Sequence, residues 1–80
     1  MSVKVYSTPT CGYCRMVKDY LKERSINFTD YNVAVDQRKA EEMVYKTHQM
    51  GVPVIDFDGK IILGFNKEKL DRVIATTRSS

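Results

Sequence analysis

The two cysteines of this sequence, Cys11 and Cys14, have the side chains and the spacing best suited to chemistry. Such a pair occurs in zinc sites, in structural disulfides and in redox-active dithiols. A closed zinc site needs about four ligands, and the chain offers only His48 in addition to the two thiols. A disulfide across so short a loop removes little entropy from the unfolded chain. The pair therefore favours redox chemistry, and a metal shared between two chains is a remote alternative.

The position of Cys11 indicates how its sulfur could become reactive. Only the thiolate attacks a disulfide, and a free cysteine has a pKa of about 8.5. Cys11 comes at the predicted start of a helix, where free N–H groups and the helix dipole favour an anion. A helix terminus contributes roughly 0.3 to 1 kcal/mol, whereas a pKa two units lower requires about 2.7 kcal/mol. We therefore expect further hydrogen bonds to the sulfur, from backbone N–H groups and from the Cys14 thiol.

The residues around the pair predict different roles for the two sulfurs. Arg15 and Lys18 are basic and no acidic residue precedes Asp19, so Cys11 lies in a locally positive stretch. Cys14 follows about one helical turn later and is expected on the inner side of the helix. We predict that Cys11 is the attacking thiolate and that Cys14 resolves the mixed disulfide.

Two other side chains are candidates for a role at this site. Tyr13 lies between the cysteines, at the exposed start of the helix, and is predicted to frame a substrate groove. His48 lies far along the chain from the cysteines and is not assigned as a general base.

Seven predicted elements must position these residues. Apolar residues alternate with polar ones in the strands and recur every three or four residues in the helices. Asp58-Gly59 predicts a hairpin turn, and Asp36 and Asn66 are predicted to cap helices. The tail 78–80 is expected to fray. The expected strands are 3–6, 28–31, 52–57 and 60–63, and the expected helices run from 11 or 12 to 24, from 37 to 48 and from 67 to 76.

The helix 37–48 is predicted to be amphipathic. Its apolar side carries Met43 and Val44, and its charged side, expected to face solvent, includes Glu42 and Lys46, which are spaced to form an ion pair. Methionines and tyrosines at helical or strand spacing are predicted to pack rather than to bind a cofactor. These are Met16, Met43, Tyr20, Tyr31 and Tyr45.

The order strand, helix, strand, helix, strand, strand, helix predicts an α/β fold in a single domain that spans residues 1–80. The strand-helix-strand opening implies a right-handed parallel crossover, and the hairpin adds antiparallel pairing. We therefore expect a mixed four-stranded sheet covered by three helices.

Composition and charge bear on the partners and on the location. The net charge is +3, but thirteen basic residues are interleaved with ten acidic ones, so no nucleic-acid partner is expected. The longest aliphatic run covers only residues 61–63, and the N-terminus lacks the apolar stretch of a signal peptide. We therefore expect no membrane contact and a cytoplasmic location, where a close cysteine pair favours catalysis. We also expect a monomer.

Two motifs together resemble a known family. The Cys-Gly-Tyr-Cys motif of residues 11–14 follows the first predicted strand, and Val52-Pro53 precedes the predicted hairpin. In so short a chain, the two motifs resemble the glutaredoxins and the related NrdH-type redoxins of the thioredoxin superfamily. The resemblance implies a thioredoxin-like fold and a cis peptide bond at Val52-Pro53. It also implies that the Val52 backbone pairs with the glutathione or the protein chain attached to Cys11.

The resemblance further implies a binding patch for glutathione or substrate. Three positions depart from the family pattern: Thr8 replaces a basic residue, Gly12 replaces a proline, and Lys67 replaces an aspartate that would bind the glutathione amino group. Lys39 and Lys67 could instead hold the glutathione carboxylates. The Gly-Phe pair at 64–65 looks more like the NrdH redoxins, which thioredoxin reductase recharges. The predicted patch consists of Tyr13, Val52, Pro53, Gly64, Phe65 and Asn66.

The predicted function is that of a thiol–disulfide oxidoreductase without a bound cofactor. It would reduce protein disulfides or glutathionylated proteins, with glutathione as co-substrate and electron donor. An NrdH-like redoxin reduced by thioredoxin reductase is the alternative within the same chemistry. A binding module with the same fold, in which the cysteines are idle or bridge a metal, is the alternative from another class.

Overall fold

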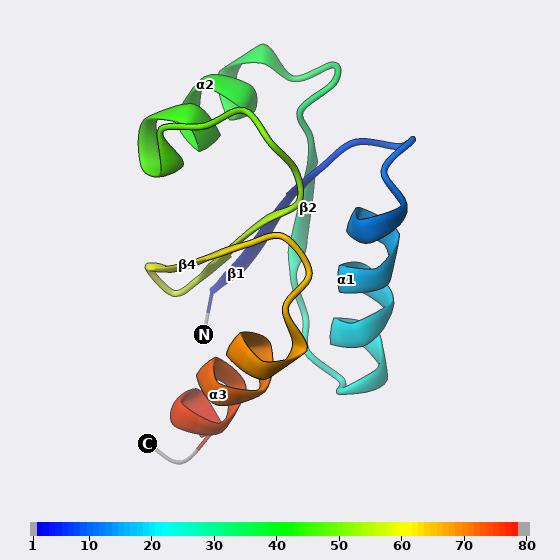
Figure 1. Ribbon diagram of the computed structural model, residues 1–80, viewed down its shortest axis with the longest axis vertical. Helices are drawn as coiled ribbons and strands as arrows, with labels where there is room; N and C mark the ends of the chain where they lie inside the picture. Colours follow the sequence, from blue (N-terminus) through cyan, green and yellow to red (C-terminus); the bar gives the residue numbers. More distant parts are fainter. Residues whose placement is uncertain (1, 79–80) are drawn as a thin grey trace.

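Four strands and three helices follow one another in the predicted order in the computed structural model, which describes residues 2–78 (Figure 1). The strand order in the sheet is β2-β1-β3-β4. β1 pairs with β2 in parallel and with β3 antiparallel, and β3 pairs with β4 antiparallel. The predicted mixed sheet is therefore confirmed. The strands are β1 (Val3–Ser7), β2 (Thr29–Asn32), β3 (Val54–Phe57) and β4 (Lys60–Leu63), and the helices are α1 (Gly12–Glu23), α2 (Gln37–Thr47) and α3 (Lys67–Arg78).

The observed boundaries differ from the predicted ones by one or two residues. β3 begins at Val54 rather than at residue 52, because Pro53 has no N–H group to donate to a neighbouring strand. α2 ends one residue early, and His48 follows it in the left-handed conformation with a φ of 58°. α3 extends to Arg78, two residues beyond its predicted end, and residues 79 and 80, the rest of the tail expected to fray, lie outside the described part. No helix within residues 2–78 combines the length and the apolar character needed to cross a bilayer.

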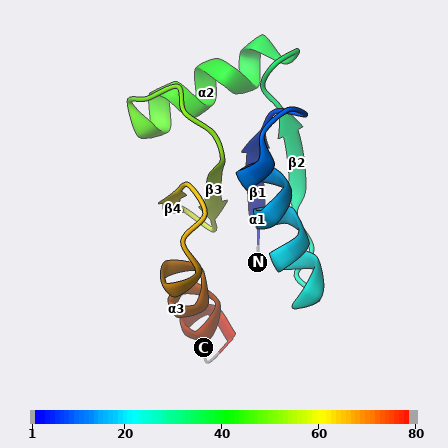
Figure 2. The same cartoon turned by 45° about the vertical axis from the view of Figure 1, so that its right-hand side comes forward.

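Alternation along the strands sends apolar side chains to both faces of the sheet. Val3 and Val5 of β1 belong to the larger core cluster, together with Leu21 of α1 and Leu70 of α3. Tyr6, from the same strand, belongs to a second cluster with Met43 of α2. Successive residues of a strand point to opposite faces, so α1 and α3 cover one face and α2 covers the other (Figure 2).

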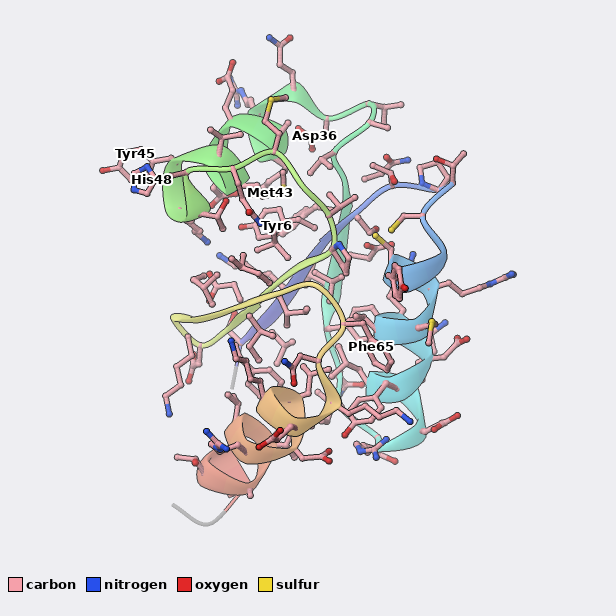
Figure 3. The ribbon with its side chains drawn as sticks, in the orientation of Figure 1. Tyr6, Asp36, Met43, Tyr45, His48 and Phe65 are labelled. Atoms are coloured by element: carbon pink, nitrogen blue, oxygen red, sulfur yellow. The ribbon has the colours of Figure 1, made fainter. Side chains whose placement is uncertain are left out.

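Two side chains that were predicted to pack are exposed instead. Met16 is 46% exposed and Tyr45 is 84% exposed. Tyr45 follows Met43 by two residues, which turns it about 200° around the helix and away from the sheet (Figure 3). Met16 comes one residue before the buried Val17 and is turned about 100° away from it, so it lies at the edge of the buried stripe of α1. Met43 and Tyr20 are buried, and the ring of Tyr31 packs against the ring of Tyr6 with centroids 5.5 Å apart. For these three side chains the prediction is confirmed.

Lys46 points toward the sheet, which corrects its predicted place on the solvent side of α2. Its Nζ lies 2.6 Å from a carboxylate oxygen of Asp56 and 3.0 Å from the Tyr6 hydroxyl. Asp56 is only 8% exposed, and it also accepts a hydrogen bond from the Gly59 N–H at 2.7 Å. The aliphatic stem of lysine can cross apolar surface so that the ammonium reaches such a carboxylate. The predicted Glu42–Lys46 ion pair also forms, at 3.7 Å.

Replacing Lys46 with methionine should lower the free energy of unfolding by about 2 kcal/mol at pH 7, because Asp56 would stay buried without its cation. Urea denaturation followed by circular dichroism measures this loss. Arg72→Met is the matched control, since Arg72 pairs with Glu68 on the exposed surface of α3 at 3.2 Å. Equal losses in the two variants would show that the buried pair has no special weight.

The same variant should change how stability depends on pH. Burial raises the pKa of Asp56, but the hydrogen bonds from Lys46 and Gly59 outweigh it and hold that pKa below the ordinary value. The stabilisation is therefore fully present above the ordinary aspartate pKa of about 3.9 and is lost as the pH falls through the lowered value. The difference between the wild type and Lys46→Met should shrink on acidification. A difference that stays constant from pH 7 to strong acid would contradict this account.

Candidate active site

Cys11 is the residue that caps the N-terminus of α1. Its backbone is extended, with φ −91° and ψ 115°, and its sulfur accepts a hydrogen bond from the Cys14 N–H at 3.3 Å. A serine or aspartate oxygen usually makes this bond. The N–H of Cys11 donates to the Thr8 carbonyl at 3.3 Å, which closes the turn between β1 and the helix. The predicted helix start is therefore confirmed, and the sulfur stands where a capping oxygen normally lies.

The surroundings of Cys11 favour its anion. Burial raises the pKa of its thiol, but hydrogen bonds from the Cys14 thiol and from the N–H groups of Cys14 and Tyr13, with the positive charge of Lys18, outweigh burial and lower that pKa. Lys18 is held in place by Asp30, whose carboxylate lies 3.1 Å from its Nζ. The direction of the shift is the one expected from the sequence, and the same groups account for it.

Cys14 has the opposite character. Its side chain is fully buried, and burial, followed by the hydrogen bond to Cys11 and the charge of that sulfur, raises the pKa of Cys14 to about 11, although the Thr8 N–H works against this rise. Both cysteines are free thiols in this structure. The partly exposed sulfur therefore loses its proton at a lower pH than the buried one.

The segment before β3 meets the start of α1 at Cys11. The Val52-Pro53 peptide bond is cis, as the resemblance implied. The Val52 carbonyl oxygen lies 3.9 Å from the Cys11 sulfur. The N–H of Gly64 donates to the Pro53 carbonyl at 2.9 Å, and its φ of 73° is one that favours glycine. The segment around Val52 thus meets the Cys11 sulfur, and the segment at Gly64 is joined to it through Pro53.

The other residues of the predicted patch differ in how they are placed. Tyr13 is 64% exposed beside Cys11, where it can frame a groove. Phe65 turns its ring toward Tyr20, with centroids 5.8 Å apart, and packs against the core. Asn66 is exposed and caps α3, since its side chain accepts from the Lys69 N–H at 3.0 Å. Its role in binding stays a prediction.

Lys39, a candidate for binding the glutathione carboxylates, contacts Glu42 and Tyr31 instead. Its Nζ lies 3.0 Å from a carboxylate oxygen of Glu42 and 4.3 Å from the centroid of the Tyr31 ring. Within residues 2–78, no group of three or more histidines, cysteines and acidic residues could hold a metal ion.

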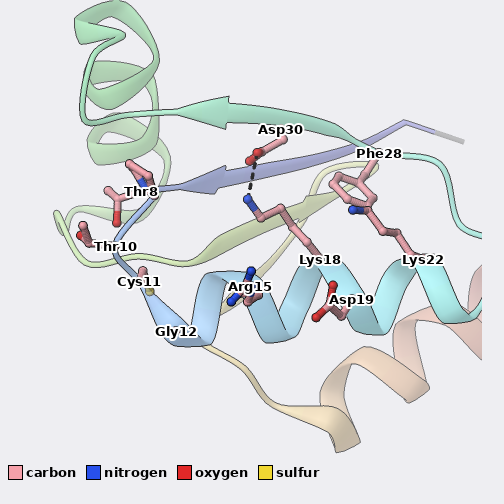
Figure 4. A pocket seen from close by; sticks show the side chains of 11 residues that line it. Thr8, Thr10, Cys11, Gly12, Arg15, Lys18, Asp19, Lys22, Phe28 and Asp30 are labelled. Carbon is pink, nitrogen blue, oxygen red and sulfur yellow. Dashed lines mark hydrogen bonds and ion pairs between the residues drawn. The ribbon is translucent and has the colours of Figure 1, made fainter.

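A groove beside Cys11 was not predicted from the sequence. It has a volume of about 670 Å³, and its walls are residues 8–12, one side of α1, Asp30 of β2 and Phe28 just before that strand (Figure 4). Cys11 is the one residue of the predicted site that lines it. The groove needs the parallel crossover to bring β2 beside α1, so no single segment reveals it. The regular spacing of Cys11, Arg15, Lys18 and Lys22 is the signal that could have found it.

Iodoacetamide should discriminate between the two thiols. In the folded protein, the alkylation rate of Cys11 should rise with pH around a midpoint below the free value of about 8.5, whereas Cys14 should need a pH near 11. Mass spectrometry of peptides after timed alkylation measures both rates. In guanidinium the two rates should become equal. A midpoint for Cys11 at or above the free value would contradict the site described above.

Comparison with known proteins agrees with this geometry. The glutaredoxin family model matches residues 3–62. An uncharacterised glutaredoxin-like protein of Clostridium pasteurianum is 53% identical over 72 residues, which cover 90% of this chain and 96% of the relative. The glutaredoxin-like protein NrdH of Lactococcus lactis is 36% identical over 74 residues, covering 89% and 97%. The glutaredoxin structure from Archaeoglobus fulgidus superposes with a TM-score of 0.84 at 26% identity, covering 91% and 85%. The chain has the thioredoxin-like fold and belongs to the glutaredoxin family.

Proposed function

We propose that this protein is a cytoplasmic, monomeric thiol–disulfide oxidoreductase that reduces protein disulfides and glutathionylated proteins, with glutathione as the electron donor. The observation that supports it most is the asymmetry of the two sulfurs. Cys11 is accessible and its pKa is lowered, whereas Cys14 is buried, in contact with it, and has a raised pKa. The Cys11 sulfur is therefore suited to attack the substrate disulfide, and the Cys14 sulfur to resolve the mixed disulfide afterwards.

The reaction uses these two sulfurs in sequence. The Cys11 thiolate attacks one sulfur of the substrate disulfide, the disulfide bond breaks, and the leaving thiolate takes up a proton. The mixed disulfide on Cys11 carries no charge, so two of the causes that raise the pKa of Cys14 disappear at this point. Cys14 then loses its proton and attacks the Cys11 sulfur, which releases the second substrate thiol. Two glutathione molecules reduce the resulting intramolecular disulfide and leave as glutathione disulfide.

The predicted patch would hold the chain attached to Cys11. The Val52 carbonyl oxygen lies near the sulfur, and an extended substrate could pair with this backbone as a strand pairs with its neighbour. Tyr13 and Gly64 would border the same path. No bound cofactor takes part in this proposal, because the electrons move between sulfur atoms.

Serine substitutions test the assigned roles. Cys11→Ser should reduce the turnover of protein disulfides and of glutathionylated substrates to the background rate, because no thiolate remains accessible. Cys14→Ser should lose the reduction of protein disulfides and keep activity on glutathionylated peptides, since a second glutathione can release the adduct. Coupled oxidation of NADPH through glutathione reductase measures both activities. Wild-type activity in Cys11→Ser would overturn the proposal.

A second electron donor is supported by particular residues. Lys67 stands at the position where the family has an aspartate for the glutathione amino group, and the preceding Gly-Phe pair looks like that of the NrdH redoxins. The similarity to the Lactococcus lactis protein NrdH points the same way. Thioredoxin reductase is therefore the second candidate for the donor.

A comparison of two coupled assays decides between the donors. The same insulin disulfide substrate is reduced with NADPH and either glutathione with glutathione reductase or thioredoxin reductase alone. Faster turnover in the first assay is expected if glutathione is the donor. Faster turnover in the second would replace the donor and leave the roles of the cysteines unchanged. Cys11→Ser is the control in both assays.

A further inference from the structure

The groove beside Cys11 is a second surface next to the same sulfur. None of Val52, Pro53 and Gly64 lines it, so it runs separately from the path proposed above. We propose that this groove binds an extended, acidic segment of the protein whose disulfide Cys11 attacks. This inference rests on the proposed function and adds the chemistry of the substrate to it.

The side chains along the groove are aligned with the sulfur. Cys11, Arg15, Lys18 and Lys22 are separated by steps of four, three and four residues, so they share one side of α1 (Figure 4). Eleven residues of helix separate the first from the last, which corresponds to roughly 16 Å at 1.5 Å per residue. An extended chain advances about 3.3 Å per residue, so about five residues can lie along the stripe.

Two of the three cations on this stripe are available to a ligand. Lys18 is already bound to Asp30 at 3.1 Å. Arg15 and Lys22 are exposed, and within residues 2–78 neither has a carboxylate within ion-pair distance. Asp19 is the other carboxylate that lines the groove, so the charge left for a ligand is positive. A segment with carboxylates complements this wall.

The spacing of the two free cations sets the positions of the acids. Arg15 lies four residues along the helix from Cys11, about 6 Å, which an extended chain covers in about two residues. Lys22 lies seven residues further, about 10 Å, which corresponds to about three more residues. The expected segment therefore has acidic side chains at the second and fifth positions from its reactive cysteine.

The length of the groove favours a protein segment over a small thiol. Glutathione has a single unit on either side of its cysteine and spans about 10 Å when extended, so it cannot connect the Cys11 sulfur with Lys22. Phe28 adds apolar surface to the groove. A polypeptide with side chains of both kinds uses the whole length.

Synthetic peptides test this inference on the full chain. Each peptide has one cysteine, activated as a mixed disulfide with 2-thiopyridine, and carries glutamate or glutamine at the second and fifth positions. The Cys11 thiolate attacks the peptide sulfur, the bond to thiopyridine breaks, and the released 2-thiopyridone is followed by its absorbance in a stopped-flow instrument. The segment could run along the groove in either chain direction. Peptides that extend from the cysteine toward the N-terminus are therefore compared with peptides that extend toward the C-terminus.

For one of the two chain directions, the glutamate peptide should react about five times faster than its glutamine counterpart at low ionic strength. Two screened ion pairs would stabilise the bound peptide enough to give this ratio. The ratio should fall as salt is added. Moving the glutamates to the first and third positions should lower it as well. Equal rates for all peptides would overturn the groove assignment and leave the redox function standing. Failure of every peptide to react would instead remove the proposed function.

Charge variants of the chain give effects of opposite sign. The double substitution Arg15→Gln and Lys22→Gln should bring the rate ratio close to one. Asp19→Asn removes an opposing carboxylate and should raise the ratio above that of the wild type. Arg38→Gln, on α2, is the matched control and should leave the ratio unchanged. A ratio that moves in the same direction in the Asp19 variant and in the double variant would contradict an electrostatic role for the groove.

Discussion

The site depends on the hydrogen bond from the Cys14 N–H to the Cys11 sulfur, at 3.3 Å. The Cys11 sulfur therefore caps α1, and the same hydrogen bond lowers the pKa of the Cys11 thiol. It also brings the second sulfur into contact with the first, because the donor belongs to the residue that carries it. Shortening or lengthening the spacing of the two cysteines would separate these functions.

The sheet supplies the other half of the site. Cys11 follows the carboxyl end of β1 by a short loop. The adjacent strand β3 begins just after the segment that places the Val52 carbonyl oxygen 3.9 Å from the Cys11 sulfur. Ser7, the last residue of β1, donates a hydrogen bond to Asp30 at 2.6 Å, and Asp30 in turn holds Lys18. The positive charge beside Cys11 is thus anchored to the centre and the edge of the sheet.

The two faces of the sheet carry different core clusters, and only one of them supports the helix with the cysteines. The larger cluster beneath α1 and α3 orients the helix that carries both cysteines. The smaller cluster lies beneath α2, and there Lys46 of α2 contacts the sheet through hydrogen bonds to Asp56 and to the Tyr6 hydroxyl. The strand that carries Asp56 begins just after the Val52 segment, so this pair stabilises an element adjoining the site without touching the Cys11 sulfur.

The amino-acid sequence by itself determined the elements and their order, and it predicted a site centred on the cysteines. Periodicity and capping residues act locally, so Asp36 and Asn66 were found as caps, and both accept the expected backbone hydrogen bonds. The hairpin at Asp58-Gly59 was found in the same way, since two residues suffice to specify that turn. The cis bond at Val52-Pro53 followed from the family resemblance and not from the residues alone.

Only the tertiary structure decided which side chains meet across the fold. Lys46 was placed on the wrong side because the helical pattern contains no information about a buried carboxylate ten residues later. Tyr45 was expected to pack, but only one side of α2 meets the sheet. The groove beside Cys11 combines α1, the preceding loop and the segment around β2. Such contacts join residues far apart in sequence, and their geometry exists only once the strands have paired and the helices have packed on them.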